Sequence, residues 1–470
     1  MSRHAVGYSV IGAGKSGVAA SNLLVSRGHD VVLYEDRADA PRPAGLDARV
    51  GYEAGHHDVR LGDVAVLSPG VPEVSPVRAE VAARAAKVIG ELELFALSCE
   101  LPILAVTGTD GKSTTTTMLG DIMAASGRPT IVGGNLGNPL TGEVALLQPG
   151  GVVVAEVSCF QLTTCETFCP AVAIVTNIAE DHTDYHGSFG AYQAAKRRVW
   201  DAMGPSGAVV LNADDPHIRG WLEGGAGPQQ TPVYWFSSRE SVTSVRGISV
   251  DVAAFLRDAV LYVTPPGGDA TPLMTRPELP LVGDHNVMNA LAAAQAAVLA
   301  GVEVATCRAA LMAYRPLPHR LNPVGTVDGV TWVNDSKATN PNAAMAGVRA
   351  ISGPLTALVG GSSKDADFGE LAALLAGRAD RVVCFGQTRD LVAAALHGAV
   401  LASGASPERA RPEVHVVPSM EAAMDLARSL TQGPATVLLA PACASFDAYK
   451  GYHHRGEVFE ARVRSWLAGA

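Results

Sequence analysis

Short apolar runs recur along the whole chain, and nearly every run ends in small polar residues. The runs lie at 8–11, 31–34, 64–67, 103–106, 152–157, 171–176, 330–333, 355–359, 382–385 and 436–440. Continuous apolar runs of this length are typical of strands that are buried on both faces of a parallel sheet. Helix-like stretches follow several of them. The repeated order of strand, polar turn and helix predicts an α/β fold.

The chain of 470 residues is long enough for two to four domains, and we predict three. Their predicted ranges are 1–100, 101–318 and 319–470, and prolines at 316 and 318 break the chain before the last one. We expect Rossmann-like first and third domains around a central domain of the P-loop ATPase type.

A glycine-rich loop follows the first predicted strand and precedes a helix-like stretch. The loop, GAGKSG at 12–17, contains Gly14, Lys15, Ser16 and Gly17, and the second strand ends at Glu35 and Asp36. This arrangement predicts a phosphate over the loop and a ribose or base on Glu35 or Asp36. The alternative is a tight turn without a ligand. A third strand ends in Ser68, Pro69 and Gly70, where parallel sheets bind ligands.

A second loop, TGTDGKST at 107–114, follows the run at 103–106. Glycines in such a loop let backbone N–H groups face phosphate oxygens, and the following helix adds a favourable dipole. Lys112 would reach the outer phosphates and Ser113 would bind Mg²⁺. The common motif has glycine where this chain has Val106, so a chance turn remains an alternative.

Three ionisable residues downstream of this loop are candidate functional residues because of their positions in or after predicted elements. Glu156 lies inside a buried strand and needs a partner, which a metal ion would supply. His182 follows a strand end, where it is either a ligand or a surface or capping residue. Lys196 lies in a helix-like stretch and by itself reads as a solvated lysine.

The segment HNVMN at 285–289 enters an alanine-rich helix. Asn286 and Asn289 are three residues apart and share a helix face. That face could hold an adenine, or Asn286 could cap the helix.

In the last domain, four strands end in small polar residues, as expected for a ligand crevice over the strand ends. Two of these ends carry lysines, Lys337 and Lys364, which suits a dianionic small substrate.

Composition narrows the class of protein. The net charge is −10 without a long basic run, so nucleic acid and anionic membranes are not expected partners. Hydrophobic residues make up 48% of the chain, yet no run reaches membrane-spanning length and we expect no signal peptide. The seven scattered cysteines suit a reducing cytoplasm.

From end to end the motifs resemble those of the Mur ligase family. The TGTDGKST loop, Glu156 with SCFQL, EDH with Lys196 downstream, and HNVMN are shared by Mur ligases and their folyl-polyglutamate relatives. NDSKATNP and LAPACASFD resemble the members that add D-glutamate. In these members a phenylalanine is often found where this chain has Tyr452.

The resemblance implies an ATP-dependent ligase of peptidoglycan precursor synthesis, cytoplasmic and monomeric. Its small-molecule substrates would be UDP-N-acetylmuramoyl-L-alanine, D-glutamate and ATP. ATP would phosphorylate the L-alanyl carboxylate, and the amine of D-glutamate would attack the acyl phosphate. The alternatives are a folyl-polyglutamate synthetase, against which the 12–17 loop and NDSKATNP argue, and a non-enzymatic nucleotide sensor.

The resemblance also implies roles for individual residues. The expected catalytic residues are Lys112, Glu156, His182, Lys196 and Lys337. ATP would be held by Gly108, Thr109, Asp110, Gly111, Lys112, Ser113, Thr114, Asn286, Asn289, Arg320 and Asp335. The UDP-sugar would be held by the glycine loop with Glu35, Asp36, Ser68, Pro69, Gly70 and Asn135. D-glutamate would be surrounded by Lys337, Thr339, Lys364, Ser445 and Tyr452.

The resemblance further implies two Mg²⁺ ions, the first on Ser113 and Glu156 and the second on His182 and Lys196. An ordinary ammonium on Lys196 would repel the second ion. In the family this lysine is carbamylated, which turns the cation into an anion with two oxygens. We therefore expect a carbamylated Lys196.

Overall fold

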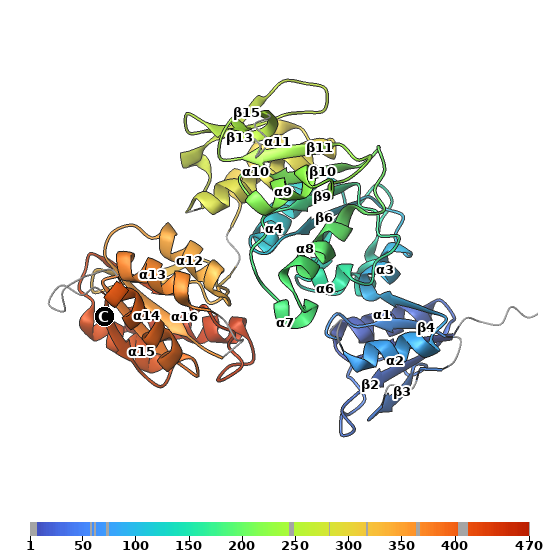
Figure 1. Ribbon diagram of the computed structural model, residues 1–470, viewed down its shortest axis with the longest axis horizontal. Helices are drawn as coiled ribbons and strands as arrows, with labels where there is room; N and C mark the ends of the chain where they lie inside the picture. Colours follow the sequence, from blue (N-terminus) through green and yellow to red (C-terminus); the bar gives the residue numbers. More distant parts are fainter. Residues whose placement is uncertain are drawn as a thin grey trace, which may run out of the picture. The chain divides into compact units, whose positions relative to one another are not determined.

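A computed structural model describes residues 7–56, 59–60, 63–71, 75–243, 249–281, 283–315, 318–362, 367–402 and 412–469. The chain divides into two compact units (Figure 1). The first unit comprises Met1–Pro280 with Val287–Tyr314, and the second comprises Leu281–Asn286 with Arg315–Ala470. Each unit is described by itself below.

The first sheet of unit 1 is parallel, with the strand order β3-β2-β1-β4-β5 over the described residues. Its strands are β1 (Gly7–Ile11), β2 (Asp30–Glu35), β3 (Gly51–Ala54), β4 (Val64–Leu67) and β5 (Lys87–Gly90). The helices are α1 (Lys15–Ser26), α2 (Pro76–Arg84) and α3 (Glu91–Ala96). This strand order places the ends of β1 and β4 side by side, so the loops at 12–17 and 68–70 meet at one edge.

The second sheet of unit 1 has the order β15-β14-β13-β11-β10-β9-β6-β8-β7, and β12 pairs with β13. Its strands are β6 (Ile103–Thr107), β7 (Thr130–Gly134), β8 (Val152–Glu156), β9 (Val172–Val175), β10 (Ala208–Asn212), β11 (Val233–Ser237), β12 (Ser241–Thr243), β13 (Ser249–Arg257), β14 (Val260–Val263) and β15 (Thr271–Thr275). The neighbouring strands β13, β11, β10, β9, β6, β8 and β7 are parallel to one another. Strands β12, β14 and β15 are antiparallel to their neighbours. The phosphate-loop strand β6 lies between β8 and β9 in the centre of this sheet.

The helical elements described between residues 110 and 315 are α4 (Lys112–Ala125), α5 (Leu140–Glu143), η1 (Val144–Leu146), α6 (Cys159–Leu162), α7 (Thr183–His186), α8 (Phe189–Arg197), η2 (Arg198–Trp200), α9 (Pro216–Glu223), η3 (Arg276–Glu278), α10 (Asp284–Leu299) and α11 (Val304–Ala313). Within unit 1, α4 packs against β7 and β8, and α11 packs against α4. These contacts hold the phosphate-loop helix on the sheet.

The sheet of unit 2 has the order β16-β17-β21-β18-β19-β20 among the described residues. Its strands are β16 (Asn322–Val327), β17 (Val330–Asn334), β18 (Leu355–Gly360), β19 (Arg381–Phe385), β20 (Glu413–Val416) and β21 (Ala435–Leu439). Its helices are α12 (Pro341–Ala350), α13 (Gly369–Arg378), α14 (Arg389–Ala402), α15 (Met420–Leu430) and α16 (Tyr452–Ala468). Only β16 is antiparallel to its neighbour, so the other five strands of the described sheet end at one edge.

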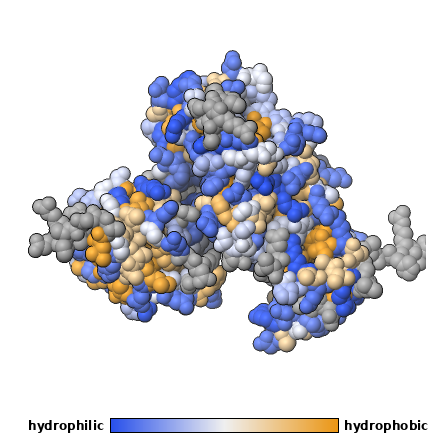
Figure 2. Space-filling view, viewed as in Figure 1, coloured by the Kyte–Doolittle hydropathy of each residue, from blue (hydrophilic) through white to orange (hydrophobic). Residues whose placement is uncertain are grey.

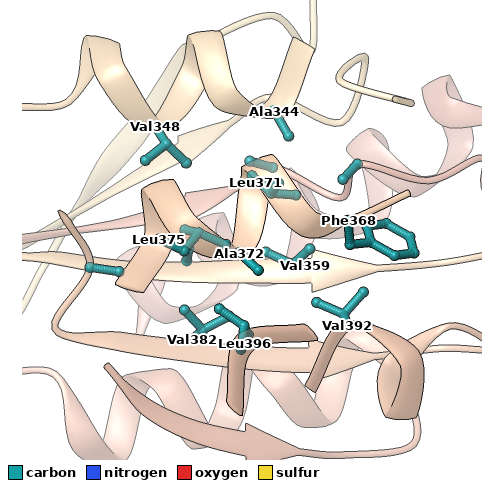
Figure 3. Packing of buried hydrophobic residues seen from close by; sticks show 14 of the residues in the cluster. Ala344, Val348, Val359, Phe368, Leu371, Ala372, Leu375, Val382, Val392 and Leu396 are labelled. Carbon is teal, nitrogen blue, oxygen red and sulfur yellow. The ribbon is translucent and has the colours of Figure 1, made fainter. Parts of the chain in front are cut away.

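Helices cover both faces of this sheet, and the strand alternation explains how. Ala357 and Val359 of β18 pack with α12, α13 and α14, as Figure 3 shows for Val359 with Leu371 and Leu375. Leu358, between them in sequence, packs on the opposite side with α15 and α16. Successive side chains of a strand point to opposite faces, so a continuous apolar run can fill two cores at once.

In the view of Figure 2, the surface of the described residues is mostly polar, and smaller hydrophobic patches lie among the polar residues. Among the described residues, no helix combines the length and apolarity needed to span a bilayer. All seven cysteines lie in the described residues, and none of them forms a disulfide there.

The predicted strands are confirmed to within two residues at each end. The helix after the phosphate loop begins at Lys112, so the last residues of the loop motif already belong to the first turn of α4. The stretch from 189 to 199 is helical, although its last turn is the 3-10 helix η2. Strands β3, β5, β7, β11 to β16 and β20 were not predicted as strands. Most of them are short, lie at the edge of a sheet or carry polar residues.

Candidate active site

The phosphate loop is held in place by the end of the neighbouring strand β9. Thr109 N–H donates to the Asn177 carbonyl (2.9 Å), and Asp110 N–H donates to Asn177 Oδ1 (2.9 Å). The Asp110 carbonyl accepts bonds from Thr176 Oγ1 (2.6 Å) and Asn177 Nδ2 (3.0 Å). The loop is therefore shaped before any ligand arrives, as expected for a preorganised phosphate cradle.

Two glycines of this loop have conformations and neighbours that exclude other residues. Gly108 has φ +138°, and a Cβ there would lie 2.0 Å from Thr176 Oγ1. Gly111 has φ +79°, and its Cβ would lie 2.4 Å from Asn289 Oδ1. Glycine at both positions thus allows the loop to turn against β9 and α10.

Two lysines converge on one carbonyl oxygen of the loop. Lys112 Nζ donates to Gly108 O (3.0 Å) and to Thr109 O (2.6 Å), and Lys196 Nζ also donates to Gly108 O. Residues 84 apart in sequence are thereby joined at the phosphate loop. Lys112 bonds the loop's own carbonyls here, so a phosphate would have to draw its ammonium away from them.

Lys196 is a buried amine. Its side chain is 2% exposed, lies 4.6 Å from the Tyr192 ring centroid, and has no ion-pair partner among the described residues. Burial, followed by repulsion from Lys112, lowers the pKa of Lys196 to about 7. The alternative of a solvated lysine is therefore wrong. Helix α8, which is capped by Ser188, directs Lys196 into the protein, whereas the next residues, Arg197 and Arg198, are only partly buried.

Glu156 fits a metal ion. It ends β8 beside Val106 of β6 and is 2% exposed. Its Oε1 accepts a bond from Asn135 Nδ2 (2.6 Å), whereas its Oε2 has no hydrogen-bond partner among the described residues. A buried carboxylate oxygen without a partner is costly unless a cation completes it. A hard cation such as Mg²⁺ prefers this kind of ligand.

Described residues contain no cluster of three His, Cys, Asp or Glu that could hold a metal alone. The predicted ligand sets do not require such a cluster, because they include the hydroxyl of Ser113 and a modified lysine. Ser113 is buried in the first turn of α4.

His182 lies among aromatic side chains, one of which, Tyr192, also packs against Lys196. It has φ +52° and precedes α7, where its side chain makes no capping hydrogen bond. Its ring lies 4.7 Å from Phe160 and 6.5 Å from Tyr192, and Nε2 lies 3.4 Å from Asp181 Oδ2. The capping alternative is therefore not supported. Tyr192, which the sequence did not single out, links this cluster to the loop through its bond with Thr109 Oγ1 (2.8 Å).

Asn289 contacts the phosphate-loop helix. Its Oδ1 accepts a bond from Thr115 Oγ1 (3.2 Å). Asn286 lies inside the first turn of α10, which begins at Asp284, so it does not cap the helix. Both asparagines are buried.

The loop at 12–17 is built for close backbone approach. Gly12 has φ +96°, and a Cβ on Gly17 would lie 1.9 Å from Gly12 O. Glu35 Oε2 accepts the Ala13 N–H (3.2 Å), and its Oε1 pairs with Arg37 Nε (3.1 Å). Partial burial alone would raise the pKa of Glu35, but the contacts with Arg37 and Ala13 together outweigh it and lower that pKa. Ser68 Oγ donates to Gly12 O (3.0 Å), which joins the two predicted UDP-sugar loops; Asp36 is exposed beside them.

Two buried glutamates of α3 connect the first sheet to the second within unit 1. Glu91 Oε1 accepts the Thr141 N–H (2.8 Å) and hydroxyl (2.7 Å). The Glu93 carboxylate accepts the N–H groups of Glu166 and Thr167 and the hydroxyl of Thr167. Sequence reasoning missed both, although two acids within an apolar stretch, ELELF at 91–95, were a visible signal.

In unit 2, the structure brings most residues of the predicted D-glutamate set to the ends of β17 and β21. Lys337 Nζ lies 5.7 Å from the Tyr452 ring centroid. Ser445 is buried, and Thr339 N–H donates to Lys337 O (2.9 Å). Lys364 lies outside the described residues. Ser362 N–H donates to Ala444 O (2.9 Å), which ties the segment after β18 to the loop that carries Ser445.

Two further predicted ATP ligands belong to unit 2. Asp335 is buried, donates its N–H to Leu439 O (3.0 Å) and accepts the Leu321 N–H on Oδ1 (3.1 Å). Arg320 is half-buried and lies between His319 and Leu321, which both have positive φ. The segment before β16 is therefore tightly turned at this arginine.

The fold is that of a multi-domain α/β protein in which two glycine loops, at 12–17 and 107–114, each follow a parallel strand. Residues 106–297 match the Mur ligase middle domain, and residues 319–443 match the Mur ligase glutamate ligase domain. The chain belongs to the Mur ligase family, and the predicted family and α/β fold class are confirmed.

Relatives of similar length make the resemblance more specific. The UDP-N-acetylmuramoylalanine–D-glutamate ligase of Pelotomaculum thermopropionicum is 39% identical, over 98% of this chain and 98% of its own. The ligase of the same name from Acidobacterium capsulatum is 36% identical, over 97% and 95%. The solved UDP-N-acetylmuramate-alanine ligase of Thermotoga maritima has the same fold, with TM-score 0.58 and 20% identity over 98% of this chain and 99% of that one.

Proposed function

We propose that the chain adds D-glutamate to UDP-N-acetylmuramoyl-L-alanine at the expense of ATP, in peptidoglycan precursor synthesis. The full-length relatives carry the name of this reaction, and the family makes the chain an ATP-dependent amino-acid ligase rather than a nucleotide sensor. The observation that supports the chemistry best is the convergence of Lys112 and the buried Lys196 on one carbonyl of the phosphate loop.

In the proposed reaction, an oxygen of the L-alanyl carboxylate attacks the γ-phosphorus of ATP and ADP leaves. The amine of D-glutamate then attacks the acyl phosphate, loses a proton, and phosphate leaves as the amide forms. Gly108, Thr109, Asp110, Gly111, Ser113 and Thr114 would cradle the phosphates, and Lys112 would move from the loop carbonyls onto the outer phosphates. Catalysis of this kind is mainly positioning and neutralisation of charge.

Mg²⁺ would neutralise the phosphate oxygens and polarise the γ-phosphoryl group. Glu156 Oε2 is a suitable ligand because it is buried and has no hydrogen-bond partner among the described residues. Ser113 would supply a hydroxyl to the same ion, while His182 and a carbamylated Lys196 would serve a second one. Asn135 would orient the Glu156 carboxylate through Oε1.

Carbamylation of Lys196 requires a neutral amine. The amine adds to the carbon of CO₂ and releases one proton, which leaves an anionic carbamate. Because burial lowers the pKa of Lys196 to about 7, a large share of this side chain is neutral near neutral pH, unlike a solvated lysine. The carbamate would also remove a buried positive charge that faces Lys112.

The substrate sites follow the loops described above. UDP-N-acetylmuramoyl-L-alanine would lie over Gly14–Gly17 and the 68–70 loop, with Glu35 or Asp36 at its uridine and Asn135 towards its alanyl end. ATP would also contact Asn286, Asn289, Arg320 and Asp335. D-glutamate would lie among Lys337, Thr339, Lys364, Ser445 and Tyr452. We further propose three domains with the predicted boundaries, a cytoplasmic monomer, and no nucleic-acid or membrane partner.

Phosphate release by the purified protein tests this function. Release should require ATP, Mg²⁺, UDP-N-acetylmuramoyl-L-alanine and D-glutamate together, and omission of any one should stop it. L-glutamate and a folate acceptor serve as matched alternatives to the amine and the carboxylate. Equal turnover with either one would contradict the proposed substrates, whereas ATP turnover without a carboxylate acceptor would contradict the ligase itself.

A further inference from the structure

Arg455 is a charged side chain that is completely buried in unit 2. It lies in the first turn of α16, is 0% exposed, and has no ion-pair partner among the described residues. Burial lowers the pKa of Arg455 to about 10, so the guanidinium stays charged at neutral pH. Burying a cation without a carboxylate is costly, so the contacts that Arg455 makes need an explanation.

Among the described residues, every hydrogen-bond acceptor of the Arg455 guanidinium is neutral and belongs to one of two loops. On the loop after β17, Nε donates to Ser336 Oγ (3.0 Å) and Nη2 donates to Ser336 O (2.8 Å). On the loop after β21, Nη1 donates to Cys443 O and Ala444 O (both 3.1 Å), and Nη2 also donates to Cys443 O (3.1 Å). One side chain therefore joins the ends of two adjacent parallel strands.

Both loops carry a residue of the predicted D-glutamate set. Ser336 precedes Lys337, and Ala444 precedes Ser445. Ser336 Oγ in turn donates to the carbonyl of Tyr452 (2.8 Å), which starts α16. The segments that carry Lys337, Ser445 and Tyr452 are thus connected through the hydrogen bonds of Arg455 and Ser336. Arg455 itself does not belong to the predicted D-glutamate set.

We propose that Arg455 is a positioning residue for D-glutamate: its guanidinium fixes the spacing between the Lys337 and Ser445 loops. This inference rests on the proposed function only for the identity of the amine substrate. A guanidinium is planar and presents five donors in a rigid fork. An ammonium at the same place has the charge but cannot span four acceptors on two loops.

The neighbouring ATP contact has its own supports, so the effect should be confined to the amine substrate. Asp335 is held by Leu439 and Leu321, and neither bond involves Arg455. Phosphorylation of the alanyl carboxylate should therefore proceed without Arg455, whereas capture of the acyl phosphate by D-glutamate should not.

The test compares Arg455→Lys with Arg462→Lys, a matched change on the same helix. Arg462 pairs with Asp425 at the surface, with 34% of its side chain exposed. In Arg455→Lys the KM for D-glutamate should rise roughly tenfold to hundredfold while the KM for ATP stays unchanged, because displaced reacting groups cost this much. Arg462→Lys should keep both constants.

Hydroxylamine separates positioning from damage to the whole enzyme. It is a small nucleophile that needs no D-glutamate site and converts an acyl phosphate into a hydroxamate. Arg455→Lys should form hydroxamate from ATP and UDP-N-acetylmuramoyl-L-alanine at the wild-type rate. If this variant loses that reaction too, Ser336→Ala, which removes one acceptor and the bond to Tyr452, should still raise the KM for D-glutamate.

An unchanged KM for D-glutamate in Arg455→Lys overturns the positioning role, and so does loss of both reactions combined with an unchanged KM in Ser336→Ala. If phosphate release by the wild-type enzyme does not depend on D-glutamate, the proposed function is contradicted instead. The two failures are therefore distinguishable.

Discussion

Replacement of Lys196 by methionine should stabilise the unliganded protein while it abolishes activity. Lys196 is 2% exposed and has no ion-pair partner among the described residues. The folded protein therefore expels its proton far more readily than the unfolded chain, in which a lysine has its ordinary pKa. Methionine has a similar length and no charge to bury.

The size of the effect follows from the two pKa values. With a pKa of about 7 when folded and 10.5 when unfolded, holding Lys196 costs about 4 kcal/mol at pH 7 and about 2 kcal/mol at pH 9. The unfolded chain binds more protons in this range, so this cost falls as the pH rises. The lost bond to Gly108 O offsets about 1 kcal/mol. Lys196→Met should thus gain about 3 kcal/mol at pH 7 and about 1 kcal/mol at pH 9.

Urea unfolding of both proteins in CO₂-free buffer between pH 7 and pH 9 measures this difference. Lys87→Met is the control, because Lys87 is exposed and pairs with Glu166, which raises the pKa of Lys87. Its stability difference from wild type should not shrink as the pH rises. Added bicarbonate should stabilise the wild type and leave Lys196→Met unaffected, since only the lysine forms a carbamate.

A Lys196→Met protein that is no more stable than wild type at pH 7 would refute this reasoning. So would a stability difference that is the same at pH 7 and pH 9, because it would show that Lys196 keeps its proton in the folded state.

Four further variants test the site and the contacts that support it. Lys196→Arg should fold but be nearly inactive, since arginine forms no carbamate under ordinary conditions, and short-chain carboxylic acids should partly restore Lys196→Ala; full activity of Lys196→Arg in the phosphate-release assay would contradict this. Lys364→Ala should raise the KM for D-glutamate tenfold to hundredfold with little change for ATP, as loss of a charge-assisted hydrogen bond costs about 1.5–3 kcal/mol; an unchanged KM removes Lys364 from the site. Glu93→Gln should lower the free energy of unfolding by about 2–3 kcal/mol, because an amide cannot accept from both N–H groups and the hydroxyl. Equal urea midpoints for Glu93→Gln and wild type would show that Glu93 does not join the two sheets energetically.

The strands that the sequence predicted lie inside a sheet rather than at its edge. A central parallel strand such as β18 is buried on both faces, so its apolar run stands out. Strand β3, with the sequence GYEA, is an edge strand and alternates between exposed and half-buried residues. The hairpin strands β14 and β15 extend the central sheet in antiparallel fashion, which a search for strand–turn–helix units does not find.

The site was predictable where chemistry lies in a contiguous motif, and less so where it depends on tertiary burial. The glycines and the lysine of the phosphate loop lie within eight consecutive residues, so the sequence alone identifies them. That motif does not indicate a role for Lys196, which stands out only because the folded α8 buries it. Arg455 was missed for the same reason: arginine in a helix is ordinarily solvated, and only the fold shows that its acceptors are loop carbonyls.

Glu156, Lys196 and Arg455 share a physical property that links stability to function. All three are at most 2% exposed, and none has an ion-pair partner among the described residues. Such groups destabilise a folded protein unless something supplies the missing charge. Mg²⁺ would supply the missing positive charge at Glu156, and reaction with CO₂ would turn the amine of Lys196 into an anion. The two carboxylates of the amino-acid substrate would supply negative charge near Arg455. A ligand that binds only the folded state stabilises that state. Binding of the substrates and the metal ion should therefore restore the free energy of unfolding that these buried charges cost the free protein.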